Sequence, residues 1–448
     1  MKFDMVIKNG RIITSTESYY ADIGISGEKI GAIGLDLDGS KIIDATGKLV
    51  TPGAVDTHVH LEMPIGEYVS TDDFYTGTRA AAFGGTTTFI DFVESKKDQS
   101  FSDALKERNG KAEAISVIDY SFHMTIGPDD MGKLNQVPAA VNAGCRSFKL
   151  YMAYGLKLND GQLLKAIDAV NKAGALPVVH AENWDIITTL IDQNIAKGNS
   201  SPRWHPRSRP AELEGEAVER VISIASYLQS PIHILHISCP EAIQRVEDAK
   251  ERGISVSAET CPQYLFLNWD VFEKKGLDGA LPICSPPIRS QESQDGLWDY
   301  LSGGCFDTIS TDHCPFTMSE KEFGMAAFNT IPGGVPSIEM RFPALYSKGV
   351  REGYITENQW VDLCCTSPAR LFGMESKGDI LVGKDADLVI FDPEKINPLS
   401  CETLHEKVDW TPYEGIDIIG WPELTISRGD ILVDKGEFKA KPGRGKFL

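Results

Sequence analysis

Four of the nine histidines in the chain lie where apolar, strand-like runs end. His58 and His60 follow the run LVTPGAVD and are two residues apart, and a strand directs residues i and i+2 to the same side. His180 ends the run ALPVVHAE, His236 lies in PIHILHIS, and Asp312 ends FDTISTD. Imidazole and carboxylate ligands without thiolate favour Zn²⁺, with Mn²⁺ or Co²⁺ as alternatives. Because one catalytic zinc uses fewer ligands than this, the pattern predicts two divalent metal ions.

A ligand that bridges two metals is expected from the run RSFKLYM, which offers Lys149 and neither Asp nor Glu. An ammonium group there would be repelled by two dications. The neutral amine can add CO₂ to become a carbamate, whose two oxygens can bridge the metals, and the dications would stabilise that anion. The sequence therefore predicts a carbamylated lysine at this position.

Apolar, β-branched runs that alternate with amphipathic helical stretches must position these residues. The eight runs are 49–56, 86–93, 115–124, 146–152, 175–182, 231–238, 254–260 and 306–312. Strand–helix alternation repeated in this way predicts a TIM-type (β/α)₈ barrel. Because a barrel builds its active site at the C-terminal ends of its strands, the candidate ligands are expected to converge on one mouth.

Both ends of the chain carry short, glycine-punctuated strands without helical periodicity. Each end is too short to form a stable domain by itself, so we expect the two ends to pair in one small β-sandwich beside the barrel. The predicted α/β organisation is residues 1–52 and 376–448 for the two parts of the sandwich, and 53–375 for the barrel.

Composition narrows the possible partners. The formal net charge of −20 argues against nucleic acid and anionic membranes, which favour a basic surface. No window approaches the roughly 20 apolar residues that a membrane span needs, and the N-terminus is typical of a first strand rather than a signal peptide. The nine cysteines are scattered without a C-x-x-C motif, which is typical of reduced thiols and favours a cytoplasmic location.

A series of motifs in order resembles the dihydropyrimidinase and hydantoinase family of cyclic amidohydrolases, in the amidohydrolase superfamily. The motifs are DTHVHLEMP (56–64), FKLYMAY (148–154), VVHAEN (178–183), ILHIS (234–238), ETCPQYL (259–265), CSPPIR (284–289), STDHCPF (310–316), IPGGVPS (331–337) and KGDILVGKDADLVIFDP (377–393). The match covers essentially the whole chain, and motifs in this order are far more specific than any one alone.

The resemblance implies two-metal hydrolysis of the ring amide of cyclic ureides, in which a metal-held hydroxide attacks the ring carbonyl. The substrates would be 5,6-dihydropyrimidines such as dihydrouracil, as in pyrimidine catabolism, and 5-substituted hydantoins, and the products N-carbamoyl amino acids. By the same resemblance, His58 and His60 hold one metal, and His180 and His236 hold the other. The carbamylated lysine bridges them, and Asp312 ligates the first metal and shuttles a proton. A homotetramer is implied by the resemblance alone.

The resemblance also nominates residues that contact the substrate. Tyr154 corresponds to a tyrosine whose hydroxyl stabilises the tetrahedral oxyanion. Ser285 and the backbone at Gly333 correspond to groups that hydrogen-bond the imide edge of the ring; the family often has Asn at the second position, and a main-chain contact survives a change to Gly. Three further residues fall where the family lines its substrate pocket, although ordinary packing explains them equally well: Ile65, Tyr151 and Leu158.

Alternatives of two classes remain open, a related enzyme and a non-catalytic scaffold. Allantoinase and dihydroorotase share the two-histidine start and the lysine bridge, and some relatives of this fold have lost their ligands and act as scaffolds. Dihydroorotases carry Arg in H-x-H-x-R, where this chain has Glu62, so neutral rings are expected to be preferred. The sequence leaves open the physiological ring, its enantiomer and the native metal.

The remaining histidines are expected to be structural. His233 has opposite parity to His236 and is expected to face the surrounding helices, and His205 is expected in a polar loop. His123 could line the mouth, and Cys261 lacks a matched base that would make it a nucleophile.

Overall fold

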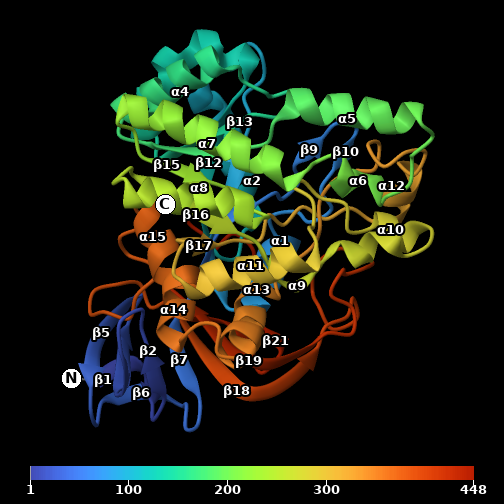
Figure 1. Cartoon of the computed structure of the whole chain (residues 1–448). Helices are drawn as coiled ribbons and strands as arrows, with labels where there is room; N and C mark the ends of the chain where they lie inside the picture. The colour runs from blue at the N-terminus through green and yellow to red at the C-terminus, as the bar shows by residue number, and fades with distance from the viewer. Residues whose placement is uncertain (1) are drawn as a thin grey trace.

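An eight-stranded parallel sheet that curves into a barrel forms the centre of the protein in the computed structural model, which describes residues 2–448 (Figure 1). Neighbouring strands along the chain are also neighbours in the sheet, and each pair is parallel. The strands are β8 (Ala54–Val59), β11 (Thr86–Val93), β12 (Asp119–Ile126), β13 (Ser147–Tyr151), β14 (Leu176–His180), β15 (Ile232–Ile234), β16 (Val256–Thr260) and β17 (Thr308–Ile309). The predicted barrel is confirmed.

The first predicted barrel strand, 49–56, is in fact divided between two sheets. Its first half, β7 (Leu49–Pro52), pairs with a strand from the C-terminal part of the chain, and its second half opens β8. Gly53 lies between them, where a Cβ atom would come within 2.1 Å of the Thr87 hydroxyl. The chain therefore leaves one sheet and enters the other at a residue that must lack a side chain.

Helices and short turns follow the barrel strands and cover the outside of the barrel (Figure 1). The longer ones are α1 (Thr76–Phe83), α2 (Phe101–Ile115), η1 (Pro128–Gln136), α3 (Val137–Asn142), α4 (Asp160–Lys172), α5 (Trp184–Ala196), α7 (Ala211–Leu228), α8 (Pro240–Glu251), α11 (Gln291–Ser302), α12 (Met318–Phe323) and η3 (Leu345–Val350). The shorter ones are α6 (Trp204–Arg207), α9 (Pro262–Phe266), η2 (Trp269–Glu273), α10 (Leu277–Ala280), α13 (Arg341–Ala344), α14 (Glu357–Val361), η4 (Asp362–Thr366) and α15 (Ser367–Leu371). A hairpin of β9 (Pro64–Ile65) and β10 (Tyr68–Val69) follows the first barrel strand.

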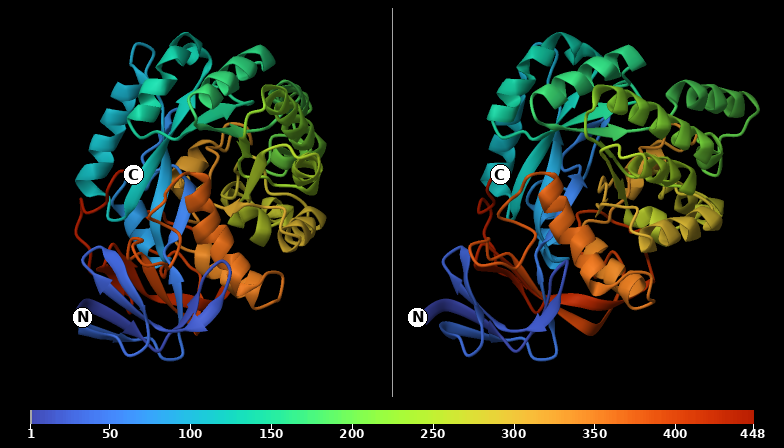
Figure 2. Two further views of the ribbon diagram at one scale, coloured as in Figure 1. Left: turned by 90° about the vertical axis from the view of Figure 1, so that its left-hand side faces the viewer. Right: turned by 60° about the vertical axis from the view of Figure 1, so that its left-hand side comes forward.

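The two ends of the chain meet in a separate β-rich domain, where N-terminal and C-terminal strands lie side by side below the barrel (Figure 2). One sheet has the order β5 (Lys29–Gly34), β4 (Asp22–Ser26), β1 (Lys2–Lys8), β6 (Asp38–Asp44). The other has the order β21 (Glu437–Phe438), β20 (Asp430–Asp434), β19 (Asp417–Ser427), β18 (Leu388–Pro398), β7, β2 (Arg11–Ile13), β3 (Ser18–Tyr20). This pairing confirms the predicted domain built from both termini.

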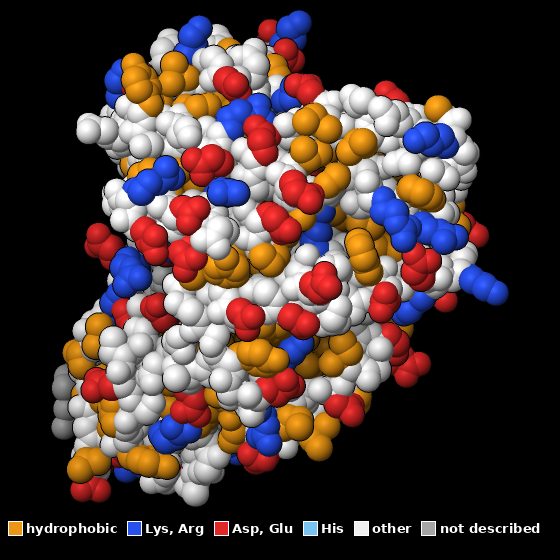
Figure 3. Space-filling view, viewed as in Figure 1, with side chains coloured by type: hydrophobic (Ala, Val, Ile, Leu, Met, Phe, Trp, Pro, Cys, Tyr) orange, Lys and Arg blue, Asp and Glu red, His pale blue; other side chains and the backbone are white. Residues whose placement is uncertain are grey.

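The largest cluster of buried apolar side chains runs through the barrel and its helices and continues into the seven-stranded sheet, where it includes Val389 and Phe391. A second cluster, which includes Ile7, Ile23 and Ile426, lies within the β-rich domain. Acidic side chains are spread over the visible face among basic ones, in keeping with the negative net charge (Figure 3). None of the helices in residues 2–448 is long and apolar enough to cross a membrane.

Two glycine-to-alanine substitutions should change the free energy of unfolding in opposite directions, one through a packing clash and the other through helix propensity. Gly53→Ala should lower the free energy of unfolding by about 1–3 kcal/mol, because the new methyl group overlaps the buried Thr87 side chain. Gly110→Ala, in the exposed middle of α2 with nothing near the new atom, should raise it by about 0.5–1 kcal/mol. Thermal or denaturant unfolding of both variants tests the contrast, and equal effects would contradict the proposed role of Gly53.

Candidate metal centre and active site

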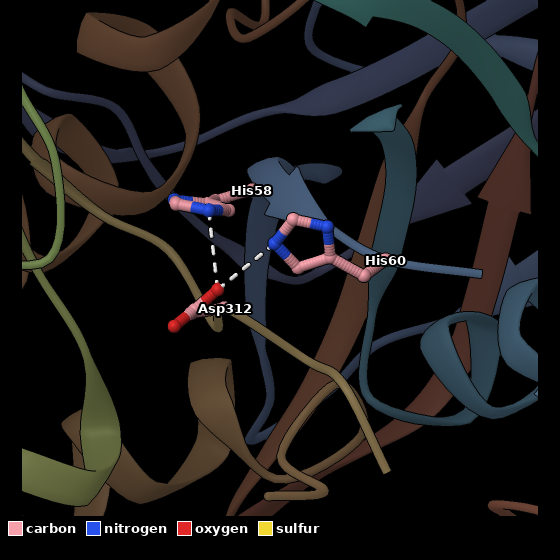
Figure 4. Close-up of side chains that lie close together, drawn as sticks. All are labelled: His58, His60 and Asp312. Carbon is pink, nitrogen blue, oxygen red and sulfur yellow. Dashed lines mark hydrogen bonds and ion pairs between the residues drawn. The ribbon is translucent and has the colours of Figure 1, made fainter. Parts of the chain in front are cut away.

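Three of the predicted ligands converge where the first and last barrel strands end (Figure 4). His58 and His60 lie at the end of β8, and Asp312 follows β17. The Asp312 Oδ1 atom lies 3.1 Å from Nε2 of His58 and 3.1 Å from Nε2 of His60. One ligand atom from each residue could therefore reach a single ion.

A second pair of imidazoles lies beside this group. The Nδ1 atom of His180, at the end of β14, is 3.0 Å from Nε2 of His236, which follows β15. The rings of His58 and His236 are 5.3 Å apart, so the two groups of histidines are adjacent. Asp312 and His236 both have positive φ angles, 51° and 38°, a conformation that is uncommon for non-glycine residues. The backbone turns sharply after these strands to direct both side chains inward.

Lys149 comes from β13 and is 1% exposed. Burial lowers the pKa of its amine to about 8, although the Asp312 and Glu259 carboxylates oppose this shift. Its Nζ atom lies 4.7 Å from the Tyr151 ring centre, and no carboxylate in residues 2–448 lies within ion-pair distance of it. A lysine in these surroundings is easier to deprotonate than an exposed one, and the neutral amine is the form that reacts with CO₂.

The donor atoms fit a divalent metal. Burial lowers the pKa of His60 to about 4 and also lowers the pKa values of His180 and His236, so their rings are neutral with a lone pair available. The His58 Nε2 atom is buried close to Asp312 without making a hydrogen bond. A nitrogen and a carboxylate oxygen that approach without bonding are arranged as two ligands of a shared ion would be.

Two buried carboxylates orient the histidines from outside the cluster. Glu259, in β16, accepts a hydrogen bond from Nδ1 of His58 at 2.7 Å and from the backbone N–H of His236 at 3.2 Å. Glu182 accepts from Nε2 of His180 at 2.7 Å and from Arg209 at 2.7 Å. Such partners fix the orientation and the tautomer of a ligand imidazole. Sequence reasoning gave these two carboxylates no role, although both lie in quoted motifs.

A cavity of about 690 Å³ opens onto these residues. All six predicted ligands line it: His58, His60, Lys149, His180, His236 and Asp312. Of the predicted substrate contacts, Ile65, Tyr151, Tyr154, Ser285 and Gly333 line it as well. Their individual roles stay predictions.

Leu158 departs from the expectation. It is 2% exposed and belongs to the hydrophobic core rather than to the cavity lining. Its backbone N–H bonds to the carbonyl of Tyr151, which turns the loop inward, and Leu156 lines the cavity in its place. An ordinary packing role, one of the two interpretations of this residue, explains it.

Tyr154 lines the cavity beside one of the candidate metal ligands, His180. Its ring centre is 5.3 Å from that of His180 and 4.8 Å from that of Trp184, and the guanidinium of Arg209 lies 5.6 Å above the ring. Burial raises the pKa of its hydroxyl to about 12, against the opposing charge of Arg209. The hydroxyl therefore keeps its proton at neutral pH and can donate a hydrogen bond.

The acidic residue that stands where dihydroorotases carry Arg is not in the cavity lining. Glu62 has a φ of 44°, and its backbone N–H bonds to the carbonyl of Asp72. The charged groups of the lining, apart from the predicted ligands, are Glu94, Asp192 and Arg209. His205, expected in a polar loop, is buried and also lines the cavity.

Comparisons with known proteins agree with this geometry. The model of the amidohydrolase family matches residues 49–432. A D-hydantoinase of Geobacillus stearothermophilus is 42% identical over 450 residues, which cover 99% of this chain and 96% of the relative. The crystal structure of a dihydropyrimidinase from Brevibacillus agri matches with a TM-score of 0.97 and 42% identity, over 99% of this chain and 98% of that one. An L-hydantoinase (dihydropyrimidinase) from Arthrobacter aurescens matches with a TM-score of 0.93 and 31% identity, over 99% of each chain.

The chain belongs to the amidohydrolase family, and within it to the hydantoinases and dihydropyrimidinases. The resemblance inferred from the motifs is therefore confirmed. This family implies a binuclear divalent metal centre, and the cluster of His58, His60 and Asp312 provides one part of such a site.

Removing the Glu259 carboxylate, which bonds to Nδ1 of His58, should weaken metal binding without removing a candidate ligand. Glu259→Gln is expected to lower metal affinity by about 10–100-fold, because the amide no longer fixes the His58 ring as a carboxylate does. Metal retained after dialysis against a graded chelator, measured by elemental analysis, tests this expectation. Glu339→Gln is the matched control, since Glu339 is a buried carboxylate that accepts from a histidine outside the site, His405. Wild-type metal affinity in Glu259→Gln would contradict the assignment.

Proposed function

We propose that this protein hydrolyses the ring amide bond of cyclic ureides, namely 5,6-dihydropyrimidines such as dihydrouracil and 5-substituted hydantoins, to N-carbamoyl amino acids. The observation that carries the proposal is that four histidines, a buried lysine and an aspartate line one cavity at the barrel mouth. Relatives named D-hydantoinase and dihydropyrimidinase over the full chain length support the same reaction.

The proposed metal site holds two divalent ions, with Zn²⁺ favoured by the nitrogen and oxygen donors and Mn²⁺ or Co²⁺ as alternatives. His58, His60 and Asp312 would hold one ion, and His180 and His236 the other. The carbamate of Lys149 would supply an oxygen to each. When bound, the metals would supply Lewis acidity and lower the pKa of water to about 7.

The side chains around the cavity have distinct parts in this proposal. Asp312 accepts a proton from the attacking water and returns it to the leaving ring nitrogen, as general base and then general acid. Burial would raise the pKa of this carboxyl, but the imidazoles of His58 and His60 hold it well below its usual range, so it starts as the base. The Tyr154 hydroxyl donates to the developing oxyanion. Ser285 and the backbone at Gly333 hold the imide edge of the ring.

Several wider features stay proposals. A homotetramer rests on the family resemblance. A cytoplasmic location rests on the scattered cysteines, none of which forms a disulfide within the described part of the chain. The scaffold alternative is disfavoured because every predicted ligand lines one cavity.

Substrate charge tests the proposal against the related enzymes. Arg209, the one arginine of the cavity lining, is committed to Glu182, while Glu94 and Asp192 make no ion pair within residues 2–448. A substrate carboxylate would therefore lack a free partner and meet repulsion. We expect kcat/KM for dihydrouracil or a 5-aryl hydantoin to exceed that for dihydroorotate at least ~100-fold, roughly 2.7 kcal/mol.

The assay compares dihydrouracil, a 5-aryl hydantoin, allantoin and dihydroorotate in one buffer with metal-loaded protein. Efficient opening of dihydroorotate would overturn the proposed specificity, and a preference for allantoin would favour that alternative. Ring opening of none of the four, in protein that holds its metal, would overturn the proposed reaction itself.

The lysine bridge has a test of its own. Lys149→Ala should lose most bound metal and nearly all activity, because β13 offers no carboxylate in its place. Mass spectrometry under non-denaturing conditions should find the mass of one CO₂ added at Lys149 in the intact protein. An unmodified lysine beside two fully occupied metals would show that the bridge is some other group.

A further inference from the structure

A buried lysine outside the metal centre joins the two backbone segments that border the substrate end of the cavity. Lys321, in α12, is 0% exposed. Its Nζ atom donates to the carbonyl of Ile283 at 3.0 Å and to the carbonyl of Gly334 at 2.9 Å. The aromatic rings of Phe316 and Trp410 lie within 6 Å of the amine, at 5.9 and 5.6 Å. No carboxylate of the described chain pairs with it.

The same two segments also bond to each other. The backbone N–H of Gly334 donates to the carbonyl of Ile283 at 2.9 Å, so this carbonyl accepts from both the lysine and the opposite segment. Ser285, two residues after Ile283, and Gly333, directly before Gly334, line the cavity. A shift of either segment would therefore move the groups assigned to the imide edge of the ring.

Further donors hold the neighbouring carbonyls of this segment. His205 donates from Nε2 to the carbonyl of Cys284 at 2.8 Å, and the hydroxyl of Tyr264 donates to the carbonyl of Pro286 at 2.9 Å. Of the carbonyls from Ile283 to Pro286, only that of Ser285 has no donor within residues 2–448. Ser285 is partly exposed and lines the cavity, so its unpaired carbonyl is available to a ligand.

We propose that Lys321 is a positioning residue that sets the separation of the Ser285 and Gly333 segments and so fixes the site for the imide edge of the ring. This inference rests on the proposed function, because it assigns a purpose to the geometry of that site. Burying a lysine without a carboxylate partner costs free energy, and the hydrogen bonds to the two backbone carbonyls offset part of it.

The chemistry of the amine suits this purpose. Burial lowers the pKa of Lys321 to about 7. The neutral amine still offers two N–H donors for the two carbonyls, so the contact does not depend on the charge. Methionine has a similar length and volume but no donor, which makes Lys321→Met the direct test.

The experiment compares the wild type with Lys321→Met and with Lys377→Met as a matched control. Lys377 is equally buried but pairs with the carboxylates of Asp119, Asp385 and Asp387, away from the cavity. Steady-state kinetics with dihydrouracil and a 5-aryl hydantoin, bound metal and the thermal midpoint are measured for each metal-loaded protein.

We expect Lys321→Met to raise KM about tenfold or more, with kcat changed less than about threefold and metal content unchanged. Lys377→Met should lower the thermal midpoint and leave KM within about twofold of the wild type. An unchanged KM in Lys321→Met, or an equal rise in Lys377→Met, would reduce Lys321 to a structural residue and overturn the proposal.

If Lys321→Met does not fold, Lys321→Gln decides the question. Gln keeps an amide donor but is one side-chain bond shorter, so it cannot span both carbonyls, and we expect a severalfold higher KM. A wild-type KM in this variant would overturn the proposal. A wild type that opens none of the rings would instead count against the proposed function, which keeps the two outcomes apart.

Discussion

The carboxylate of Asp312, held between two imidazoles from the opposite edge of the barrel sheet, is the interaction on which the site depends. β8 and β17 are the edge strands of that sheet, and they meet where Val59 pairs with His313 and the N–H of His60 donates to the His313 carbonyl at 2.9 Å. The contacts that close the barrel therefore also bring Asp312 next to His58 and His60. The uncommon φ of Asp312 is tolerated because the closed barrel determines it from both sides.

Buried carboxylates then decide which ring nitrogen faces the cavity. Glu259 occupies Nδ1 of His58 and leaves Nε2 without a hydrogen bond, whereas Glu182 occupies Nε2 of His180 and leaves Nδ1 directed at Nε2 of His236. Taking such charges out of water costs several kcal/mol each, so they persist only where good partners offset the cost. Arg209 is that partner for Glu182, with both carboxylate oxygens at 2.7 Å. Carboxylates that are not themselves candidate ligands therefore determine which nitrogen of each imidazole faces the cavity, and the nitrogen differs between His58 and His180.

Sequence reasoning succeeded where periodicity determines geometry and failed where the backbone departs from a regular strand. The residues at strand ends, from His58 to Asp312, could be predicted because a barrel brings all such ends to one mouth. His233 was expected to face the helices, but it lies 3.7 Å from Glu259, because β15 ends at Ile234 and the parity of a strand no longer holds at His236. Glu259 itself carries no pattern that distinguishes a partner of a ligand from any buried acid.

The cavity divides its two tasks between different kinds of group. In the proposed reaction, buried ionisable side chains would carry the chemistry, whereas the ring edge would meet backbone segments that Lys321 holds through two carbonyls. Apolar side chains, among them Leu156, Trp184 and Phe328, also line the cavity. A volume of about 690 Å³ suits a drug-sized ligand and exceeds what an unsubstituted dihydropyrimidine fills. In the proposed function, a bulky apolar 5-substituent would be buried there, and its binding energy would help to hold the ring amide in place.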